Sequence, residues 1–386
     1  MKKFLIFILL LSLVINLQVS VLASENSNEQ YKLLSEITND ELSTFALNFA
    51  KDFKPNLNLE VGEIIPIYNE PDALIGFSIS YVLDNNPYGY INLNFTKENP
   101  VSDFSIFKGE NSIYNILAID INKQNSFRTI EKKLYSFGGL QYAIPFDENG
   151  ETVFHFSDGE NIKFNINTNN KAGVKYNSHS ELFSKTYRYG ALLNTEAYTS
   201  KYNKSKSLIS ESYIESYIES TTNKYACSVL ALTEIANQEN ILKNSNIVNT
   251  FNQLWKDTDT TVINVKNGIS YGSTLDSKLG SSMTTYAKSM GKNNTTVTTK
   301  SNPNFEFFKN IINNNASGIF KYAIDLTDGS GSGHAVNMIG YCVVRLNGVF
   351  YNYLVVADGW HNDAPRYFNF SETDFRDSYG VKFIIK

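Results

Sequence analysis

A single cysteine at the start of an apolar helical run is the feature that most constrains the fold of this chain. The residues after Cys227 predict a helix to about Glu239, because apolar side chains recur on one face at Val229, Leu232, Ile235 and Ala236. A sulfur in the first turn of a helix lies near the positive end of the helix dipole, which favours a thiolate over a thiol. The pattern therefore predicts a nucleophilic cysteine on a buried helix.

Two later segments supply partners for such a nucleophile. His334 follows a Gly-rich run and begins a strand-like apolar segment, so its imidazole is placed to take the thiol proton and return it to a leaving amine. Asp358 ends another strand-like segment, where its carboxylate is expected to accept a hydrogen bond from that imidazole. Trp360 is expected to cover this bond. His361 lies in a turn-like segment and is the weaker candidate base.

The bulk properties of the sequence limit the remaining possibilities. The chain has 386 residues, 42% of them hydrophobic, which suits two folded domains. Its formal net charge is −5 and it has no long basic run, so nucleic acid is not an expected partner. No cluster of Cys and His residues suggests a metal or another cofactor. We expect a monomer.

Residues 1–23 are predicted to be a signal peptide. Lys2 and Lys3 precede the apolar run Phe4–Ile15, which is short for a membrane span, and the small-residue cleavage pattern Val21–Ala23 follows it. We therefore expect secretion to the extracellular space without stable membrane association. An uncleaved N-terminal anchor is the alternative.

The region 24–200 is predicted to be a helix on an antiparallel sheet. A capping box at Thr38–Glu41 opens an amphipathic helix, and period-2 alternation predicts strands at 64–68, 76–82, 89–95, 103–107 and 152–156. His155 is expected to be a strand residue. The region offers no candidate catalytic residue and is read as a binding or covering module.

Residues 201–222 are rich in Lys, Ser, Tyr and Glu and are predicted to be an exposed linker open to proteolysis. The region 223–386 has helical patterns first, followed by antiparallel strands, which is typical of an α+β domain. Its expected helices are 247–255, 275–290 and 305–314, and its expected strands are 319–325, 335–346, 351–357, 367–369 and 381–385.

The chain has two cysteines, Cys227 and Cys342, and a disulfide between them is the structural alternative to a nucleophile. Cys342 lies in the strand-like run after His334, where a small buried apolar residue would serve equally well.

The segments around Cys227, His334 and Asp358–Trp360 resemble the nucleophile helix, base strand and orienting strand of the papain-like cysteine peptidases. Secreted bacterial peptidases of the staphopain type are the most similar, and streptopain is more distant. The resemblance covers about residues 205–386, and the strands at 56–160 are similar in style to the propeptides of those enzymes. It implies a helical part and an antiparallel sheet or barrel, with Cys227 as nucleophile, His334 as base, Asp358 in the usual place of asparagine, and Trp360 as its shield.

One position departs from the family pattern. The family usually has a glutamine six residues before the cysteine, which donates its amide to the oxyanion, and Thr221 stands there in this chain. Asn223 is the nearest amide that could replace it, acting with the backbone N–H of Cys227. Its alternative role is N-cap of the helix.

These features predict a secreted cysteine endopeptidase that acts on polypeptide substrates and is made as a zymogen, with its own N-terminal region as an intramolecular inhibitor. Two other functions remain open: a cell-wall peptide amidase or endopeptidase with the same Cys/His pair, and a catalytically inactive secreted binding protein. A permanent second domain is the alternative to a detachable propeptide.

Overall fold

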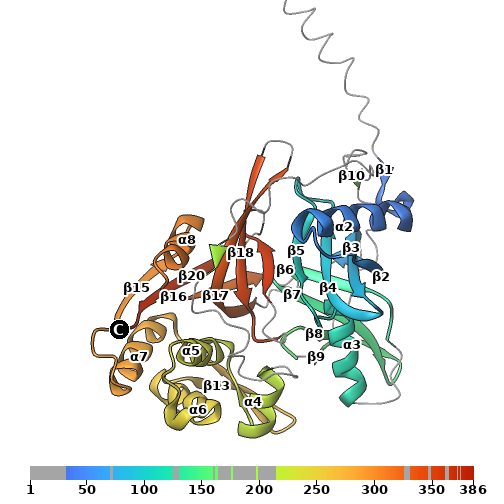
Figure 1. Ribbon diagram of the computed structural model, residues 1–386. Helices are drawn as coiled ribbons and strands as arrows, with labels where there is room; N and C mark the ends of the chain where they lie inside the picture. The colour runs from blue at the N-terminus through green and yellow to red at the C-terminus, as the bar shows by residue number, and fades with distance from the viewer. Residues whose placement is uncertain are drawn as a thin grey trace, which may run out of the picture.

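The computed structural model describes residues 32–69, 73–124, 130–159, 161–163, 175–176, 197–198, 214–325, 331–346, 349–360, 365–371, 373 and 375–386 (Figure 1). The expected signal peptide, His361 and residues 201–213 of the expected linker lie outside these ranges. Within them, no helix is both long enough and apolar enough to cross a bilayer.

The N-terminal half is built from strands that carry two helices. Helix α2 (Asn39–Phe53) begins with the expected capping box, in which the Thr38 hydroxyl accepts from the Glu41 N–H and the Glu41 carboxylate accepts from the Thr38 N–H. The buried face of α2 packs on the sheet. The second helix, α3 (Ile113–Gln124), was not expected from the sequence. The strands are β2 (Glu60–Asn69), β3 (Ala73–Leu83), β4 (Asn86–Asn94), β5 (Val101–Ile106), β6 (Leu134–Gly138), β7 (Gln141–Glu148), β8 (Glu151–Phe156) and β9 (Asn161–Ile162). These strands pair antiparallel as expected, except for the parallel pair β2–β6.

The C-terminal half places its helices before most of its strands, as the sequence predicts. The helices are α4 (Ile214–Thr222), α5 (Cys227–Gln238), α6 (Ile247–Asp257), α7 (Asp276–Ser289) and α8 (Phe305–Asn313). The long strands are β16 (Ser317–Asp325), β17 (Gly331–Leu346), β18 (Val349–Ala357), β19 (Arg366–Asn369) and β20 (Asp377–Ile384). Shorter strands are β12 (Lys224–Tyr225), β13 (Thr261–Lys266), β14 (Ile269–Ser273) and β15 (Thr296–Ser301). The predicted α+β class is confirmed.

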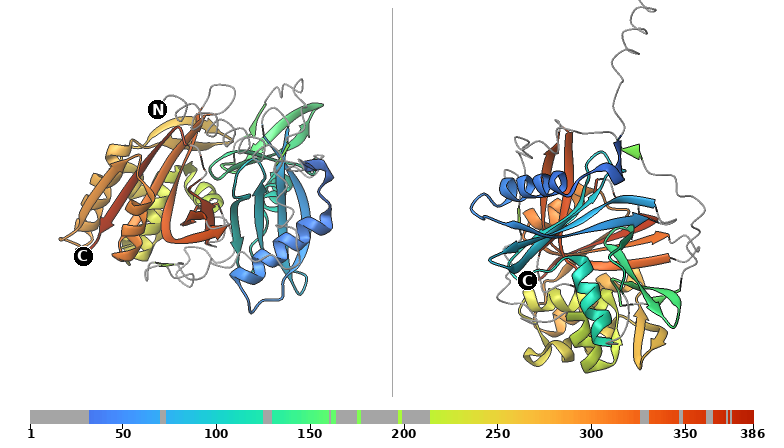
Figure 2. Two further views of the ribbon diagram at one scale, coloured as in Figure 1. Left: turned by 90° about the horizontal axis from the view of Figure 1, so that it is seen from above. Right: turned by 90° about the vertical axis from the view of Figure 1, so that its right-hand side faces the viewer.

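The two halves are joined through one continuous sheet, which the sequence did not predict. Strand β19 pairs antiparallel with β5, with Tyr367 opposite Phe104. The strand order of the sheet is therefore β15–β20–β16–β17–β18–β19–β5–β4–β3–β2–β6–β7–β8–β9. In Figure 2 the strands of the two halves lie side by side. The remaining short strands pair as β1 (Lys32–Leu33) with β10 (Lys175–Tyr176), and β11 (Ala197–Tyr198) with β17.

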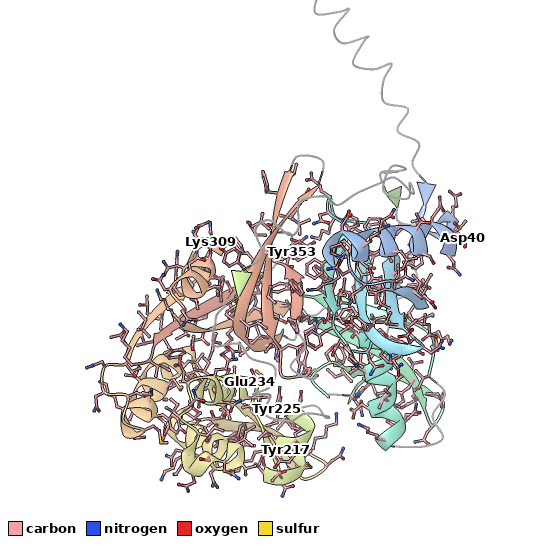
Figure 3. All side chains as sticks on the ribbon, in the orientation of Figure 1. Asp40, Tyr217, Tyr225, Glu234, Lys309 and Tyr353 are labelled. Carbon is pink, nitrogen blue, oxygen red and sulfur yellow. The ribbon has the colours of Figure 1, made fainter. Side chains whose placement is uncertain are left out.

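A shared hydrophobic core lies across this junction. One cluster holds Phe49 and Phe53 of α2, Phe104 of β5, and Tyr353 and Tyr367 of the C-terminal half. The rings of Phe104 and Tyr367 stack with centroids 4.5 Å apart. Tyr353 lies at the boundary between the halves (Figure 3), where the Asn99 amide donates to its hydroxyl at 2.9 Å. The N-terminal half is therefore packed as part of the same body.

Candidate active site

Cys227 is the first residue of α5, as the sequence predicts. The residue before it, Ala226, is extended (φ −154°, ψ 117°) and provides no side-chain cap, so the first N–H groups of the helix have no capping side chain. The residues Ser228–Ala236 are buried, and α5 packs on β16 and β17. Burial of nearly all of the helix fixes the position of the sulfur against the sheet.

The sulfur lies beside the strand that carries His334. Helix α5 packs on β17, and Cys227 packs against the buried cluster that includes Ala335, the residue after His334. His334 is 1% exposed. Its Nε2 lies 2.7 Å from the backbone carbonyl oxygen of Asp358, and a carbonyl can only accept, so Nε2 carries the hydrogen. This leaves Nδ1 as the basic nitrogen of the neutral imidazole.

Trp360 lies against the histidine. Its indole stacks on the imidazole of His334 with ring centroids 3.7 Å apart and planes 11° from parallel. The ring of Tyr322 meets the imidazole edge-on, with ring centroids 6.4 Å apart. The imidazole is therefore held by two rings and one carbonyl, which restricts its rotation.

Asp358 contacts His334 differently from the sequence-based expectation. The sequence predicts a hydrogen bond between the imidazole and the Asp358 carboxylate, whereas the contact with the imidazole is made by the Asp358 backbone carbonyl. The carboxylate turns the other way: Oδ1 accepts from the backbone N–H of Trp360 at 3.0 Å, and Oδ2 accepts from Nη1 of Arg366 at 3.0 Å. A fully buried arginine competes for the carboxylate because an isolated buried charge is costly.

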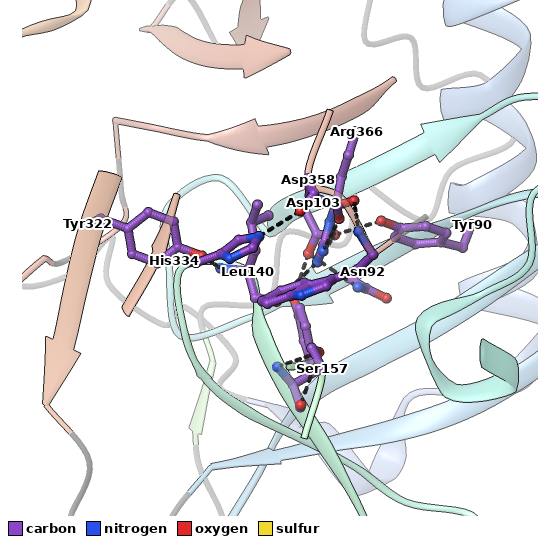
Figure 4. Close-up of polar contacts among 11 residues, drawn as sticks. Tyr90, Asn92, Asp103, Leu140, Ser157, Tyr322, His334, Asp358 and Arg366 are labelled. Carbon is purple, nitrogen blue, oxygen red and sulfur yellow. Dashed lines mark hydrogen bonds and ion pairs between the residues drawn. The ribbon is translucent and has the colours of Figure 1, made fainter. Parts of the chain in front are cut away.

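Arg366 links the site to the N-terminal half. Its side chain is 1% exposed, and its Nε donates to Oδ1 of Asp103 at 3.1 Å. Asp103 lies on β5 and also accepts from the Tyr90 hydroxyl, the Asn92 amide and the Tyr142 hydroxyl (Figure 4). No local sequence pattern predicts this network; the one sequence signal is an arginine at the start of an apolar strand.

The N-terminal half also contacts the site through the turn between β6 and β7. The backbone N–H of Leu140 donates to the Tyr322 hydroxyl at 3.0 Å, and Leu140 belongs to the same buried cluster as Trp360. Gly139 in this turn adopts φ +57°, and an added Cβ would lie 2.6 Å from the Tyr322 ring. The turn therefore approaches the Tyr322 ring as closely as a residue without a side chain allows.

The electrostatics of Cys227 differ from the expectation drawn from the helix dipole alone. Burial raises the pKa of its thiol above the ordinary value, while the positive charge of Lys321 and hydrogen bonds from Ala335 and Ser228 act to lower it. Lys321 is opposite Ala335 in the β16–β17 register and is also bound to Asp276 at 2.6 Å. Desolvation therefore outweighs the opposing effects and favours the neutral thiol in this arrangement.

Asn223 is not the N-cap of α5, because that position is Ala226. Asn223 instead ends α4 in a left-handed conformation (φ 56°), where its N–H donates to the Glu219 carbonyl and its carbonyl accepts from the Ser270 N–H. Its side chain and that of Thr221 are exposed. A role of the Asn223 amide at the oxyanion stays a prediction.

The alternatives for the other candidate residues are resolved within the described chain. Cys227 and Cys342 are both free, and they belong to different hydrophobic clusters, so the disulfide alternative is wrong. His155 is a buried residue of strand β8, as expected, and its Nε2 lies 2.9 Å from Oδ2 of Asp120. The described residues include no group of three or more His, Cys, Asp or Glu side chains suited to a metal ion.

Comparisons with known proteins give little beyond this geometry. No family model matches the sequence, and no curated protein matches it. Among solved structures, the chain is similar to the active wild-type interpain A cysteine protease of Prevotella intermedia, with 13% identity and a TM-score of 0.24. The match covers 35% of this chain and 54% of that chain, so this chain spans about half the length of the structure it matches.

Proposed function

We propose that this protein is a secreted cysteine endopeptidase that hydrolyses peptide bonds in polypeptide substrates. The observation that carries the proposal is the arrangement of Cys227 at a helix start against the strand of His334, whose Nε2–H is bound by the Asp358 carbonyl and whose ring is stacked under Trp360. A fixed histidine tautomer with a basic Nδ1 beside a cysteine is the requirement for thiol activation.

The reaction follows from these positions. The Cys227 proton passes to Nδ1 of His334, the thiolate forms a bond to the carbonyl carbon, and the peptide C–N bond breaks as the imidazolium gives its proton to the leaving amine. A water molecule then hydrolyses the thioester with His334 as base. We propose that the backbone N–H of Cys227, at the start of α5 where no side chain caps the helix, donates a hydrogen bond to the oxyanion.

The test of this function compares two assays. We expect processed protein to release fluorescence from labelled casein and to leave purified cell wall uncleared. We also expect iodoacetamide to modify Cys227 and to spare Cys342, which is fully buried. Clearing of wall without casein hydrolysis would favour the cell-wall alternative, and labelling without hydrolysis of any peptide would favour a binding protein.

We further propose that the chain is made as a zymogen whose N-terminal half covers the site. The contacts of Leu140 with Tyr322 and of Asp103 with Arg366 support this, as does the burial that raises the thiol pKa. A neutral, desolvated thiol is a poor nucleophile. The β5–β19 pairing implies that a cleaved N-terminal fragment stays bound until that pairing opens.

Cleavage of the full chain in trans tests the zymogen proposal. Active enzyme should cut the Cys227→Ala protein between β11 and α4, at residues 199–213, because both flanking elements are held by backbone hydrogen bonds. Iodoacetamide should react with Cys227 of cleaved wild-type protein about tenfold faster at mildly acidic pH than with the intact chain. Intact protein that is as active and as reactive as cleaved protein would rule out the cover.

A further inference from the structure

A pocket of about 120 Å³ lies where helices α3 and α4 of the two halves face each other. Helix α3 contributes one face, at the spacing i, i+3, i+4 and i+7: Ile113, Ile116, Leu117 and Asp120. Helix α4 contributes Glu215 and Glu219, one turn apart. The pocket thus has an apolar wall opposite a pair of carboxyl groups, an arrangement that the hydrolysis mechanism does not use.

Glu215 is buried and Glu219 is half-buried, and each has a carboxyl oxygen without a hydrogen-bond partner among the described residues. Glu215 is 7% exposed, and the Oε1 atoms of Glu215 and Glu219 have no hydrogen-bond partner among the described residues. Burial raises the pKa of Glu215 well above its ordinary value and raises that of Glu219 to about 7. A buried acceptor without a donor is destabilising, so a donor that enters the pocket would be favourable.

The pocket is coupled to the proposed active site by direct contacts. Trp360 lines the pocket and stacks on His334 with its ring. The N–H of Glu215 donates to the carbonyl of Gly359 at 3.3 Å, which attaches the start of α4 to the turn that carries Asp358 and Trp360. A negative charge on the Cys227 sulfur would also act to raise the pKa of Glu215.

We propose that this pocket binds an organic cation, a primary amine or guanidinium on a short aliphatic stem. The cationic head would donate to the free carboxyl oxygens of Glu215 and Glu219, and the stem would lie along Ile113, Ile116 and Leu117. Two sources have this chemistry: a free small amine and the Lys or Arg side chain of a peptide. Binding at this place would hold α3 and α4 together and thereby stabilise the docked N-terminal half.

The charges around the pocket predict how binding depends on pH. The groups that act on Glu219 are the acidic Asp120 and Asp158, the hydroxyl of Tyr271 and the positive Lys266, while His155 is bound to Asp120. A cation binds the ionised carboxylate, and Glu219 is protonated below about pH 7. Affinity for the cation should therefore rise about tenfold between about pH 6 and about pH 8.

Calorimetric titration of full-length Cys227→Ala protein tests the proposal without any need for hydrolysis. Agmatine is the free-amine probe, N-acetyl-lysine methylamide is the side-chain probe, and 1-pentanol is the neutral control. We expect Glu219→Gln and Glu215→Gln to weaken binding of the cations about tenfold. The matched control is Glu306→Gln on α8, where the carboxylate is 70% exposed and far from the pocket lining.

The outcomes separate clearly. Binding of both cations supports a site for a basic side chain, and binding of agmatine alone supports a site for a free amine. A lack of binding, or binding that neither Glu219→Gln nor a change from pH 6 to pH 8 alters, would overturn the proposal. Because the titrated protein lacks its thiol, none of these results depends on the peptidase assignment. Thermal melting of each variant verifies that it is folded.

Discussion

Replacing Cys227 by alanine should lower kcat/KM for peptide hydrolysis on the order of 10⁵-fold, because the reaction loses the atom that bonds to the substrate. Because Cys227 is only partly buried, the free energy of unfolding of the Cys227→Ala protein should differ from that of the wild type by less than about 1 kcal/mol. His334→Ala should cause a loss of similar size, because the proposed mechanism then lacks the base that accepts the thiol proton. Steady-state kinetics with a fluorogenic peptide and urea unfolding measure the two effects.

The matched control is Cys342→Ala, which makes the same chemical change in a fully buried core position of β17. It should reduce stability by about 1–2 kcal/mol and leave kcat/KM nearly unchanged. His361→Ala should also retain most of the activity. Turnover of Cys227→Ala within tenfold of the wild type would refute the assignment of the nucleophile.

Replacing Arg366 by methionine should reduce the free energy of unfolding by about 3–5 kcal/mol. The reason is that Asp103 and Asp358 would both remain buried after the loss of the cation that pairs with them. Activity should fall as well, because Asp358 supplies the carbonyl that fixes His334. Urea unfolding at neutral pH measures the loss, with the midpoint and the slope compared separately.

Arg376→Met is the control for this change. Arg376 lies 3.6 Å from Asp377, and both side chains are largely exposed, so its loss should cost less than about 1 kcal/mol. Adding Asp103→Asn to Arg366→Met should recover part of the stability, since it removes one of the uncompensated charges. Equal losses for Arg366→Met and Arg376→Met would show that the buried network contributes little.

Local sequence patterns were sufficient for the elements that hold the candidate catalytic residues. The apolar spacing after Cys227 predicted α5, and the capping box predicted the start of α2. Apolar strand-like runs predicted β17 and β18, which carry His334 and lead to Asp358. Helix α3 was missed because its turns carry polar residues among the apolar ones, so its periodicity is weak.

The contacts within the site depended on pairings that no local pattern encodes. Asp103 and Arg366 are far apart in the sequence, and only the β5–β19 pairing brings them together. Arg366 in turn binds the Asp358 carboxylate, while the Asp358 backbone carbonyl contacts His334. The direction of the Cys227 pKa shift was likewise set by burial under neighbouring segments, which a helix-dipole argument does not include.

The sequence by itself determined which residues start helices and strands, because capping, periodicity and turn chemistry act within a few residues of the chain. It thereby determined that a cysteine opens a buried helix and that a histidine begins a strand. Only the tertiary structure decided that the two halves form one sheet and that Arg366 holds Asp358. It also decided that Glu215 and Glu219 face a pocket, because strand pairing and the burial of charge depend on segments more than a hundred residues apart.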